Sequence, residues 1–234
     1  CILLHIFFMF DIIIKRGLVI MNLKKIRKRT QYDPYKSSRA AGFEYLNRNY
    51  CRKGQTVLLG DSITEGYNHT EMFKDYTANT GTEVYNRGIS GDTSDRLLER
   101  LEKTVLNIKP KNIVVLIGTN DLGVGADIDF ISRNVENIIT ASKKRCKNIN
   151  IILEAVYPIN DKINKQGRRK NKDIAALNER YKAIADKQNI TFLDLTKQLS
   201  DDSGRLNEKY TYDGLHVNSF AYELITRAVL PLLK

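Results

Sequence analysis

Apolar residues from about Gln55 onward follow two patterns that alternate along the chain. Short runs rich in β-branched residues recur, and between them lie longer segments in which apolar residues repeat every three or four positions. A continuous apolar run is typical of a strand buried on both faces, and the longer repeat is typical of an amphipathic helix. The pattern predicts strands at Thr56–Leu59, Thr82–Asn86, Asn112–Ile117, Asn150–Val156 and Thr191–Leu195.

The longer segments predict the helices that connect these strands. Four main helices are expected, with a shorter one before the first strand: Thr93–Leu106, Asp127–Cys146, Lys172–Gln188, Phe220–Leu233 and Phe43–Cys51. Strand–helix alternation with continuous apolar strands favours a parallel α/β sheet that is covered on both faces. We therefore expect a flavodoxin-like, doubly wound fold with a five-stranded parallel sheet, whose site lies at the carboxyl ends of the strands.

Small, polar, glycine-rich loops follow four of the predicted strands. They are Gly60–Thr64, Asn86–Thr93, Gly118–Asp121 and, after a longer connection, Tyr212–His216. Because the carboxyl ends of parallel strands meet at one edge of the sheet, we expect these four loops to lie together.

Taken singly, each loop has a purely structural explanation. Ser62 could cap the next helix, with Glu65 three residues later completing a capping box. Ordinary turn and cap chemistry also explains the other polar positions, which are Gly88, Gly91, Asn120, Asp213 and His216.

Taken together, the four loops supply the groups that acyl transfer needs. A serine nucleophile needs a base, the base needs an acid to hold its tautomer, and the developing oxyanion needs hydrogen-bond donors. The chain has three histidines, and only His216 has an acid at a useful spacing, Asp213. His69 is expected to be a loop residue. The spacing after Ser62 differs from the G-x-S-x-G nucleophile elbow.

The four loops, in this order, resemble the motif blocks of the SGNH (GDSL-type) esterases and lipases. The matching segments are Gly60–Ile63, Asn86–Thr93, Gly118–Asp121 and Asp213–His216, with Ile63 in place of the usual leucine. The second block is most similar to bacterial members that resemble the platelet-activating-factor acetylhydrolase α-subunits. The resemblance covers roughly Gln55 to Leu233.

The resemblance implies a role for each matching residue. Ser62 is expected to attack an ester carbonyl, His216 to act as general base and then acid, and Asp213 to orient His216. The backbone N–H groups of Ser62 and Gly88 and the side chain of Asn120 are expected to form the oxyanion hole. No metal and no cofactor are expected, since histidines are few and cysteines are scattered.

A small-molecule ester is the expected substrate, and a short-chain, acetyl ester is favoured. The polar, basic loop at residues 161–172 is either a solvated surface or a rim that favours anionic substrates. Three alternatives stay open: an inactive binding module of this fold, a thioester or lysophospholipid hydrolase, and a phospho-accepting receiver-like domain. The last would use Asp61, Asp121 and Lys197.

Charge separates the first 54 residues from the rest. They hold 12 Lys and Arg against three Asp and Glu, which leaves the remainder only +2 of the formal net charge of +11. A nucleic-acid-binding domain carries its basic patch on the folded unit, so nucleic-acid binding is not expected. We expect residues 1–54 to be a basic extension and residues 55–234 to be the catalytic domain.

The apolar segment at residues 1–20 is too short in its uninterrupted part to cross a bilayer, which takes ~20 residues. It also lacks the basic start and cleavage site of a signal peptide. The favoured expectation is an extension on a cytoplasmic protein, and the alternative is weak membrane association through residues 1–29. Three widely spaced cysteines suit a reducing compartment.

Overall fold

The structure is a computed structural model that describes residues 33–165 and 167–234. The chain divides into two units, and the second, Ser38–Lys234, contains the sheet. The apolar and basic segments at residues 1–29 lie outside the described residues, so their expected roles stay predictions. Within the described part of the chain, no helix has both the length and the apolar character needed to cross a membrane.

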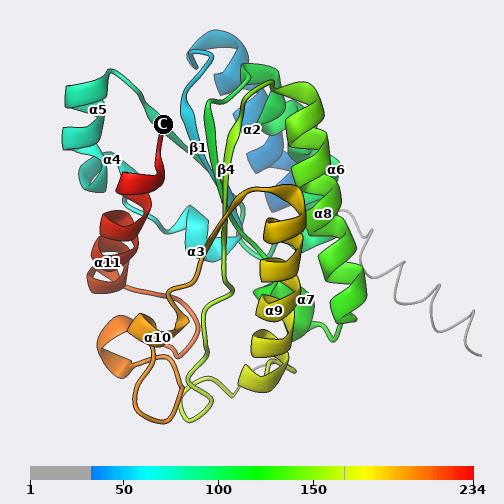
Figure 1. Ribbon diagram of the computed structural model, residues 1–234, viewed down its shortest axis with the longest axis vertical. Helices are drawn as coiled ribbons and strands as arrows, with labels where there is room; N and C mark the ends of the chain where they lie inside the picture. The colour runs from blue at the N-terminus through cyan, green and yellow to red at the C-terminus, as the bar shows by residue number, and fades with distance from the viewer. Residues whose placement is uncertain (1–32, 166) are drawn as a thin grey trace, which may run out of the picture. The chain divides into compact units, whose positions relative to one another are not determined.

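Five parallel strands form the sheet, in the order β2-β1-β3-β4-β5 (Figure 1). The predicted α/β fold and its parallel sheet are confirmed. The strands are β1 (Thr56–Gly60), β2 (Val84–Gly88), β3 (Asn112–Leu116), β4 (Asn150–Glu154) and β5 (Thr191–Leu193). Gly60 at the end of β1 pairs with Gly88 and Leu116, so the carboxyl ends of three strands are level.

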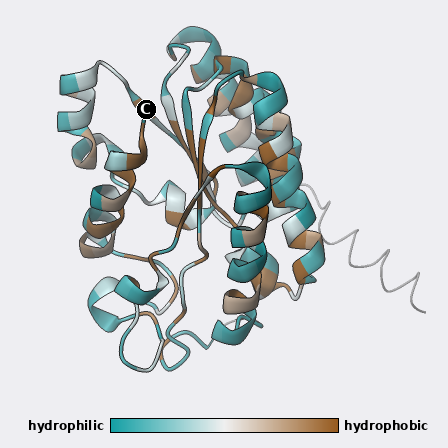
Figure 2. Ribbon diagram, in the orientation of Figure 1, coloured by the Kyte–Doolittle hydropathy of each residue, from teal (hydrophilic) through white to brown (hydrophobic). Residues whose placement is uncertain are grey.

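Helices cover the sheet on both sides (Figure 1). Val57 and Leu59 of β1 pack with one core, which includes apolar residues of α6 (Ser94–Thr104), α8 (Ile128–Arg145) and α9 (Asn171–Gln188). Leu58 points the other way, into a second core with α11 (Ser219–Val229). Side chains of a strand alternate between its faces, so one continuous apolar run fills both cores. Figure 2 shows apolar residues along the strands and on the helix faces toward the sheet.

The other elements are short. They are α3 (Ser62–Glu65), α4 (His69–Met72), α5 (Lys74–Thr80), α7 (Thr119–Gly123), α10 (Thr196–Leu199) and three 3-10 turns at Leu106–Ile108, Glu208–Tyr210 and Leu230–Leu232. His69 was expected in a loop, but it begins α4, and its ring nitrogen Nδ1 lies 3.2 Å from the carbonyl oxygen of Tyr67. No carboxylate partner of His69 is seen among the described residues.

The helix before β1 is longer than expected. α2 runs over Pro34–Asn49, whereas the pattern predicted Phe43–Cys51. Its Asn47 is buried and donates from Nδ2 to the carbonyl oxygen of Thr104 at the end of α6. The compact unit that holds the sheet begins at Ser38, ahead of the boundary expected at residue 55. The sequence pattern missed the first part of α2 because the helix is only weakly amphipathic, with Phe43 and Asn47 as its buried residues.

Candidate active site

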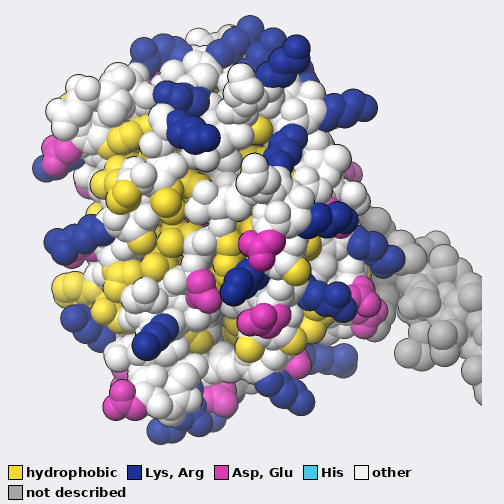
Figure 3. Space-filling view, viewed as in Figure 1, with side chains coloured by type: hydrophobic (Ala, Val, Ile, Leu, Met, Phe, Trp, Pro, Cys, Tyr) yellow, Lys and Arg dark blue, Asp and Glu magenta, His cyan; other side chains and the backbone are white. Residues whose placement is uncertain are grey.

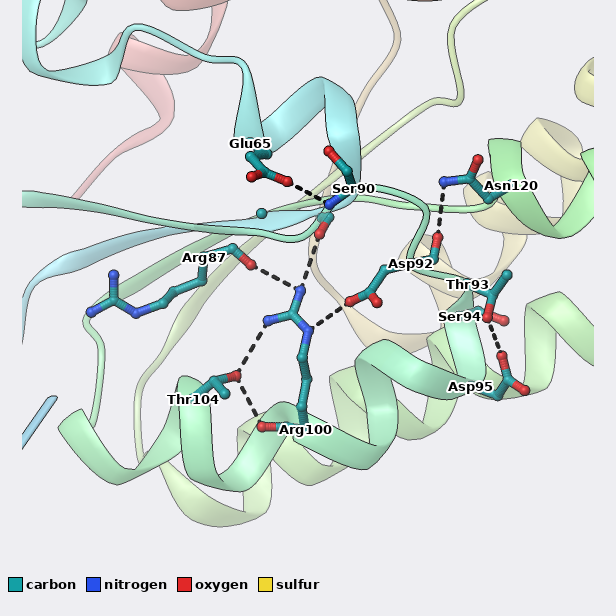
Figure 4. Close-up of polar contacts among 12 residues, drawn as sticks. Glu65, Arg87, Ser90, Asp92, Thr93, Ser94, Asp95, Arg100, Thr104 and Asn120 are labelled. Carbon is teal, nitrogen blue, oxygen red and sulfur yellow. Dashed lines mark hydrogen bonds and ion pairs between the residues drawn. The ribbon is translucent and has the colours of Figure 1, made fainter. Parts of the chain in front are cut away.

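Ser62 is the first residue of α3 and is separated from the end of β1 by Asp61 alone. The cap of this helix is Asp61, whose Oδ1 accepts the N–H of Ile63 at 3.0 Å. Glu65 makes no capping box, since its Oε2 accepts the N–H of Ser90 in the loop after β2 (Figure 4). Interpreting Ser62 as a cap is therefore wrong, and its half-buried hydroxyl serves another contact.

The hydroxyl of Ser62 contacts His216, which lies 154 residues further along the chain. Ser62 Oγ is 2.9 Å from His216 Nε2, and His216 Nδ1 is 2.6 Å from Asp213 Oδ2. The other carboxylate oxygen of Asp213 accepts the backbone N–H groups of Leu215 and His216, at 2.9 and 2.8 Å. The three side chains singled out from the sequence thus form one hydrogen-bonded line.

The acid of this line stays charged. Partial burial opposes ionisation of Asp213, but the hydrogen bonds from His216 and from two backbone N–H groups outweigh it and lower the pKa below its usual range. An ionised Asp213 favours the tautomer of His216 that carries its proton on Nδ1 and leaves Nε2 to accept from Ser62. Asp213 does not cap α11, because the side chain of Asn218 does so.

The loop that carries Asp213 and His216 is held against the segment after β4. Asn160 donates its N–H to the carbonyl oxygen of Gly214 at 2.8 Å, and Gly214 adopts a φ of 80°. A Cβ there would come within 2.6 Å of the Asn160 carbonyl oxygen, so glycine is required. Tyr212 stacks on the imidazole of His216, with centroids 6.1 Å apart.

Asn120 comes from α7, which follows β3, and it is held at both ends of its amide. Nδ2 donates to the carbonyl oxygen of Asp92 at 3.0 Å, and Oδ1 accepts from Arg169 Nη2 at 3.0 Å (Figure 4 shows the first contact). Its amide therefore bonds to the loop after β2 and to the loop before α9, and it forms no local Asx turn.

Gly88 does not have the geometry expected of an oxyanion donor. It is buried as the last residue of β2, and its N–H donates to Asn86 Oδ1 at 2.8 Å. A Cβ at Gly88 would lie 2.2 Å from the backbone nitrogen of Glu65, so this glycine lets α3 pack directly on β2. The predicted role of Gly88 stays a prediction, and this hydrogen bond within the chain counts against it.

Gly91, three residues later, occupies an exposed turn of the same loop. The N–H of Asp92 donates to the carbonyl oxygen of Ile89 at 3.1 Å, and Gly91 has a φ of 74°. A type II turn requires a positive φ at its third residue, which only glycine adopts readily.

Comparison with known proteins places this geometry in a family. The model of the GDSL-like lipase/acylhydrolase family matches residues 58–224. The chain belongs to this family. It is thus a carboxylic ester hydrolase, and the resemblance noted from the four motif blocks is confirmed.

Two relatives and one solved structure are similar to this chain. The acylhydrolase is 27% identical over 186 residues to the α1 subunit of platelet-activating factor acetylhydrolase IB from Bos taurus, covering 78% of this chain and 76% of that one. It is 31% identical over 160 residues to an N-acylneuraminate cytidylyltransferase from Escherichia coli, covering 65% of this chain but only 35% of that protein. A Streptococcus pneumonia structure described provisionally as a platelet activating factor superposes with a TM-score of 0.78 at 26% identity, covering 93% and 99% of the two chains.

One arginine of the acylhydrolase ties the carboxyl ends of β1 and β2 to the loop after β2 (Figure 4). Arg100 of α6 donates from Nε to Asp92 Oδ2 at 2.7 Å, and from Nη2 to the carbonyl oxygens of Gly60 and Arg87 at 3.1 and 2.8 Å. The side chains of Arg100 and Asp92 are 8% and 2% exposed. The sequence held a signal for it, because Arg100 falls on the apolar stripe three residues after Leu97.

Two further buried acids lie beneath the site of the acylhydrolase. Burial raises the pKa of Asp61 to about 7, and the nearby Asp92 and Asp121 carboxylates add to the effect. Burial also raises the pKa of Asp121 to about 6, although Ser94 donates to it from both its N–H and its hydroxyl. Among the described residues, no group of three or more His, Cys, Asp or Glu side chains is placed to hold a metal ion.

Proposed function

We propose that the protein hydrolyses short-chain carboxylic esters, with acetyl esters preferred, through a Ser62–His216–Asp213 triad and an acyl-enzyme. The observation that carries the proposal is the line of two hydrogen bonds, 2.9 and 2.6 Å long, that joins the three side chains. A serine hydroxyl is a weak nucleophile until a neighbouring base accepts its proton, and an acid beyond the base fixes the tautomer.

The reaction runs in two halves. Ser62 Oγ attacks the carbonyl carbon while His216 Nε2 takes the hydroxyl proton, and the proton then passes to the leaving alkoxide as the acyl–serine forms. His216 next takes a proton from water, the resulting hydroxide attacks the acyl carbon, and the proton returns to Ser62 as the acid leaves. Asp213 stabilises the imidazolium in both halves.

The oxyanion is stabilised by donors from three loops. We assign the backbone N–H of Ser62, Nδ2 of Asn120 and a backbone N–H of the glycine-containing loop after β2. The turn that carries Gly91 is fixed to α3 on one side, through Glu65, and to Asn120 on the other. Donors held in advance at the place where charge develops lower the barrier without reorganising during the reaction.

The preference for acetyl esters is supported by the name of the bovine relative, an acetylhydrolase. The name of the Escherichia coli relative refers to an acylated acidic sugar. An acetyl ester of an acidic sugar is therefore the second substrate to test, beside an acetylated phospholipid. An ester panel should therefore vary acyl length on one chromogenic alcohol, and then vary the alcohol on one acetyl group. Equal or faster hydrolysis of long-chain esters would contradict the acetyl preference.

Substitution of Ser62 tests the nucleophile. Ser62→Ala should lower kcat by about 10⁴-fold or more, because the triad acts as a unit. A variant that keeps more than about a tenth of the wild-type rate would rule out Ser62 as nucleophile. Asn120→Ala should lower kcat roughly 10²- to 10³-fold, as expected for one oxyanion donor.

Two other classes of function are tested by simple measurements. A binding module without activity would not react with a fluorophosphonate, whereas the proposed enzyme should be labelled at Ser62 and lose labelling in Ser62→Ala. A phospho-accepting domain needs an accessible aspartate, but Asp61 is only 1% exposed. Figure 3 shows both Lys and Arg and Asp and Glu side chains on the face that it draws.

A further inference from the structure

Among the described cations of the basic loop, Arg169 is the one that contacts Asn120 of the proposed oxyanion hole. Its Nη2 donates to Oδ1 of Asn120 at 3.0 Å, and its Nε donates to the carbonyl oxygen of Thr119 at 2.9 Å. Arg169 is half-buried, whereas its neighbour Arg168 is exposed. Burial lowers the pKa of Arg169, and the Asp61 carboxylate opposes that shift. A guanidinium still stays protonated at neutral pH.

The guanidinium is seated on α7 as well as hydrogen-bonded to it. A Cβ placed on Gly123 would lie 2.6 Å from both Cζ and Nη2 of Arg169, so the plane of the guanidinium occupies the space that a side chain would fill. The N–H of Arg168 also donates to the carbonyl oxygen of Gly123, at 3.3 Å. The loop before α9 is thus docked on α7 at two points, and Arg169 is held against Asn120 by contacts within the chain.

These contacts determine which way the amide of Asn120 faces. A guanidinium has only donors and a backbone carbonyl has only acceptors, so Arg169 requires the amide oxygen on its side and Asp92 requires the amide nitrogen on the other. A flipped amide would set donor against donor and acceptor against acceptor. One N–H of Nδ2 then points to Asp92, and the second is the donor available to the reacting carbonyl.

We propose that Arg169 is a positioning residue that holds the Asn120 amide in its donor orientation and polarises it from behind. Its positive charge beside Oδ1 withdraws electron density from the amide, which makes the Nδ2 protons better donors to the oxyanion. Hydrogen bonds to a charged group are shorter and stronger than neutral ones, and linked bonds polarise one another. The inference rests on the proposed function, because it needs Asn120 to contact the transition state.

The test measures kcat and KM for an acetyl ester in Arg169→Met, with and without Asn120→Ala. We expect Arg169→Met to lower kcat by about tenfold with KM unchanged, because the interaction it supports exists only in the transition state. In the Asn120→Ala background the same substitution should change kcat by less than about twofold, since its target is gone. Arg169→Lys, which keeps the charge, should recover part of the loss.

Arg168→Met is the matched control, because it removes a neighbouring arginine whose side chain lies against Gly125 instead of Asn120. It should leave kcat unchanged. Gly123→Ala is the second variant, and it displaces the guanidinium while retaining Arg169 and favouring the helix of α7. It should lower kcat in the same direction and remains informative if Arg169→Met fails to fold.

The outcomes separate this inference from the proposed function. Wild-type rates in Arg169→Met and Gly123→Ala, a change in KM alone, or an equal loss with and without Asn120 would each overturn the positioning role while Ser62-dependent hydrolysis stands. A wild-type enzyme without Ser62-dependent hydrolysis would overturn the proposed function itself.

Discussion

Glu154 is a buried acid whose charge should oppose folding at neutral pH. It ends β4, is 5% exposed, and accepts one hydrogen bond, from the hydroxyl of Tyr157 to Oε1 at 2.8 Å. The surrounding small cavity is lined mainly by apolar and aromatic side chains, among them Leu58, Val114, Tyr222, Ile225 and Val229. Burial raises the pKa of Glu154 from 4.5 to about 7, and the bond from Tyr157 opposes the shift only in part.

The size of the effect follows from this pKa difference. Between about pH 4.5 and 7 the unfolded chain loses the proton of Glu154 while the folded protein keeps it, so the free energy of unfolding falls as pH rises. At about 1.4 kcal/mol per unit of pKa, the loss is complete above pH 7 and amounts to roughly 3 kcal/mol. Glu154→Gln removes the titration but keeps an oxygen for Tyr157, so its stability relative to wild type should rise as the pH rises from about 4.5 to 7.

Denaturant unfolding of both proteins between pH 5 and pH 8 measures this difference directly. The amide nitrogen of Gln adds a pH-independent penalty of about 1–3 kcal/mol if it is unsatisfied, so the diagnostic is the change with pH and not the absolute value. The difference should rise by roughly 2–3 kcal/mol across the range. Glu136→Gln is the control, because a hydrogen bond from Lys187 lowers the pKa of that surface carboxylate and its small effect should have the opposite sign. A difference that is flat with pH would refute the assignment of Glu154 as a buried, protonated acid.

Two further substitutions test packing around the site. Gly88→Ala places a Cβ 2.2 Å from the backbone of α3 and should lower the free energy of unfolding by roughly 3 kcal/mol or more in denaturant. Gly42→Ala is the control, because a Cβ there would have nothing within 4 Å, and it should be neutral or slightly stabilising. Equal stabilities of the two variants would contradict the close approach of α3 to β2. Arg100→Met removes the cation beside the buried Asp92 carboxylate and should lower the free energy of unfolding by about 3–5 kcal/mol at pH 7. The double variant with Asp92→Leu should recover part of this stability. Additive losses in the double variant would argue against the ion pair.

The fold and the hydrogen-bonded line of Ser62, His216 and Asp213 could be predicted from the sequence, because both depend mainly on short-range signals. Continuous apolar strands separated by amphipathic helices leave few arrangements other than a parallel sheet, and such a sheet brings its strand-end loops together. Asp213 and His216 lie three residues apart, so their contact depends on one local turn. Only the approach of Ser62 to His216 is long-range, and the parallel topology supplies it.

The choice between Gly88 and Gly91 could not be made in the same way. Both stand in one glycine-containing loop segment, and the decision depends on where β2 ends. The strand was expected to end at Asn86, but its ladder with β1 continues to Gly88 opposite Gly60. Strand ends are set by pairing with neighbours, which a single sequence does not record. The extra two residues move Gly88 from the loop into the sheet.

The geometry of the oxyanion hole depends on contacts that no motif block contains. Asn120 is a motif residue, but its amide is oriented by Asp92 and Arg169, and Asp92 is in turn held by Arg100. The two arginines come from α6 and from the loop before α9. Arg169 looks like an ordinary loop cation in the sequence, whereas Arg100 falls on the apolar stripe of α6 but lies in no motif block. Because donor placement within a fraction of an ångström decides the strength of transition-state hydrogen bonds, the proposed mechanism predicts that these arginines affect the rate of the reaction. Ester hydrolysis by a chain that keeps every block but lacks either arginine should therefore be measurable and slow.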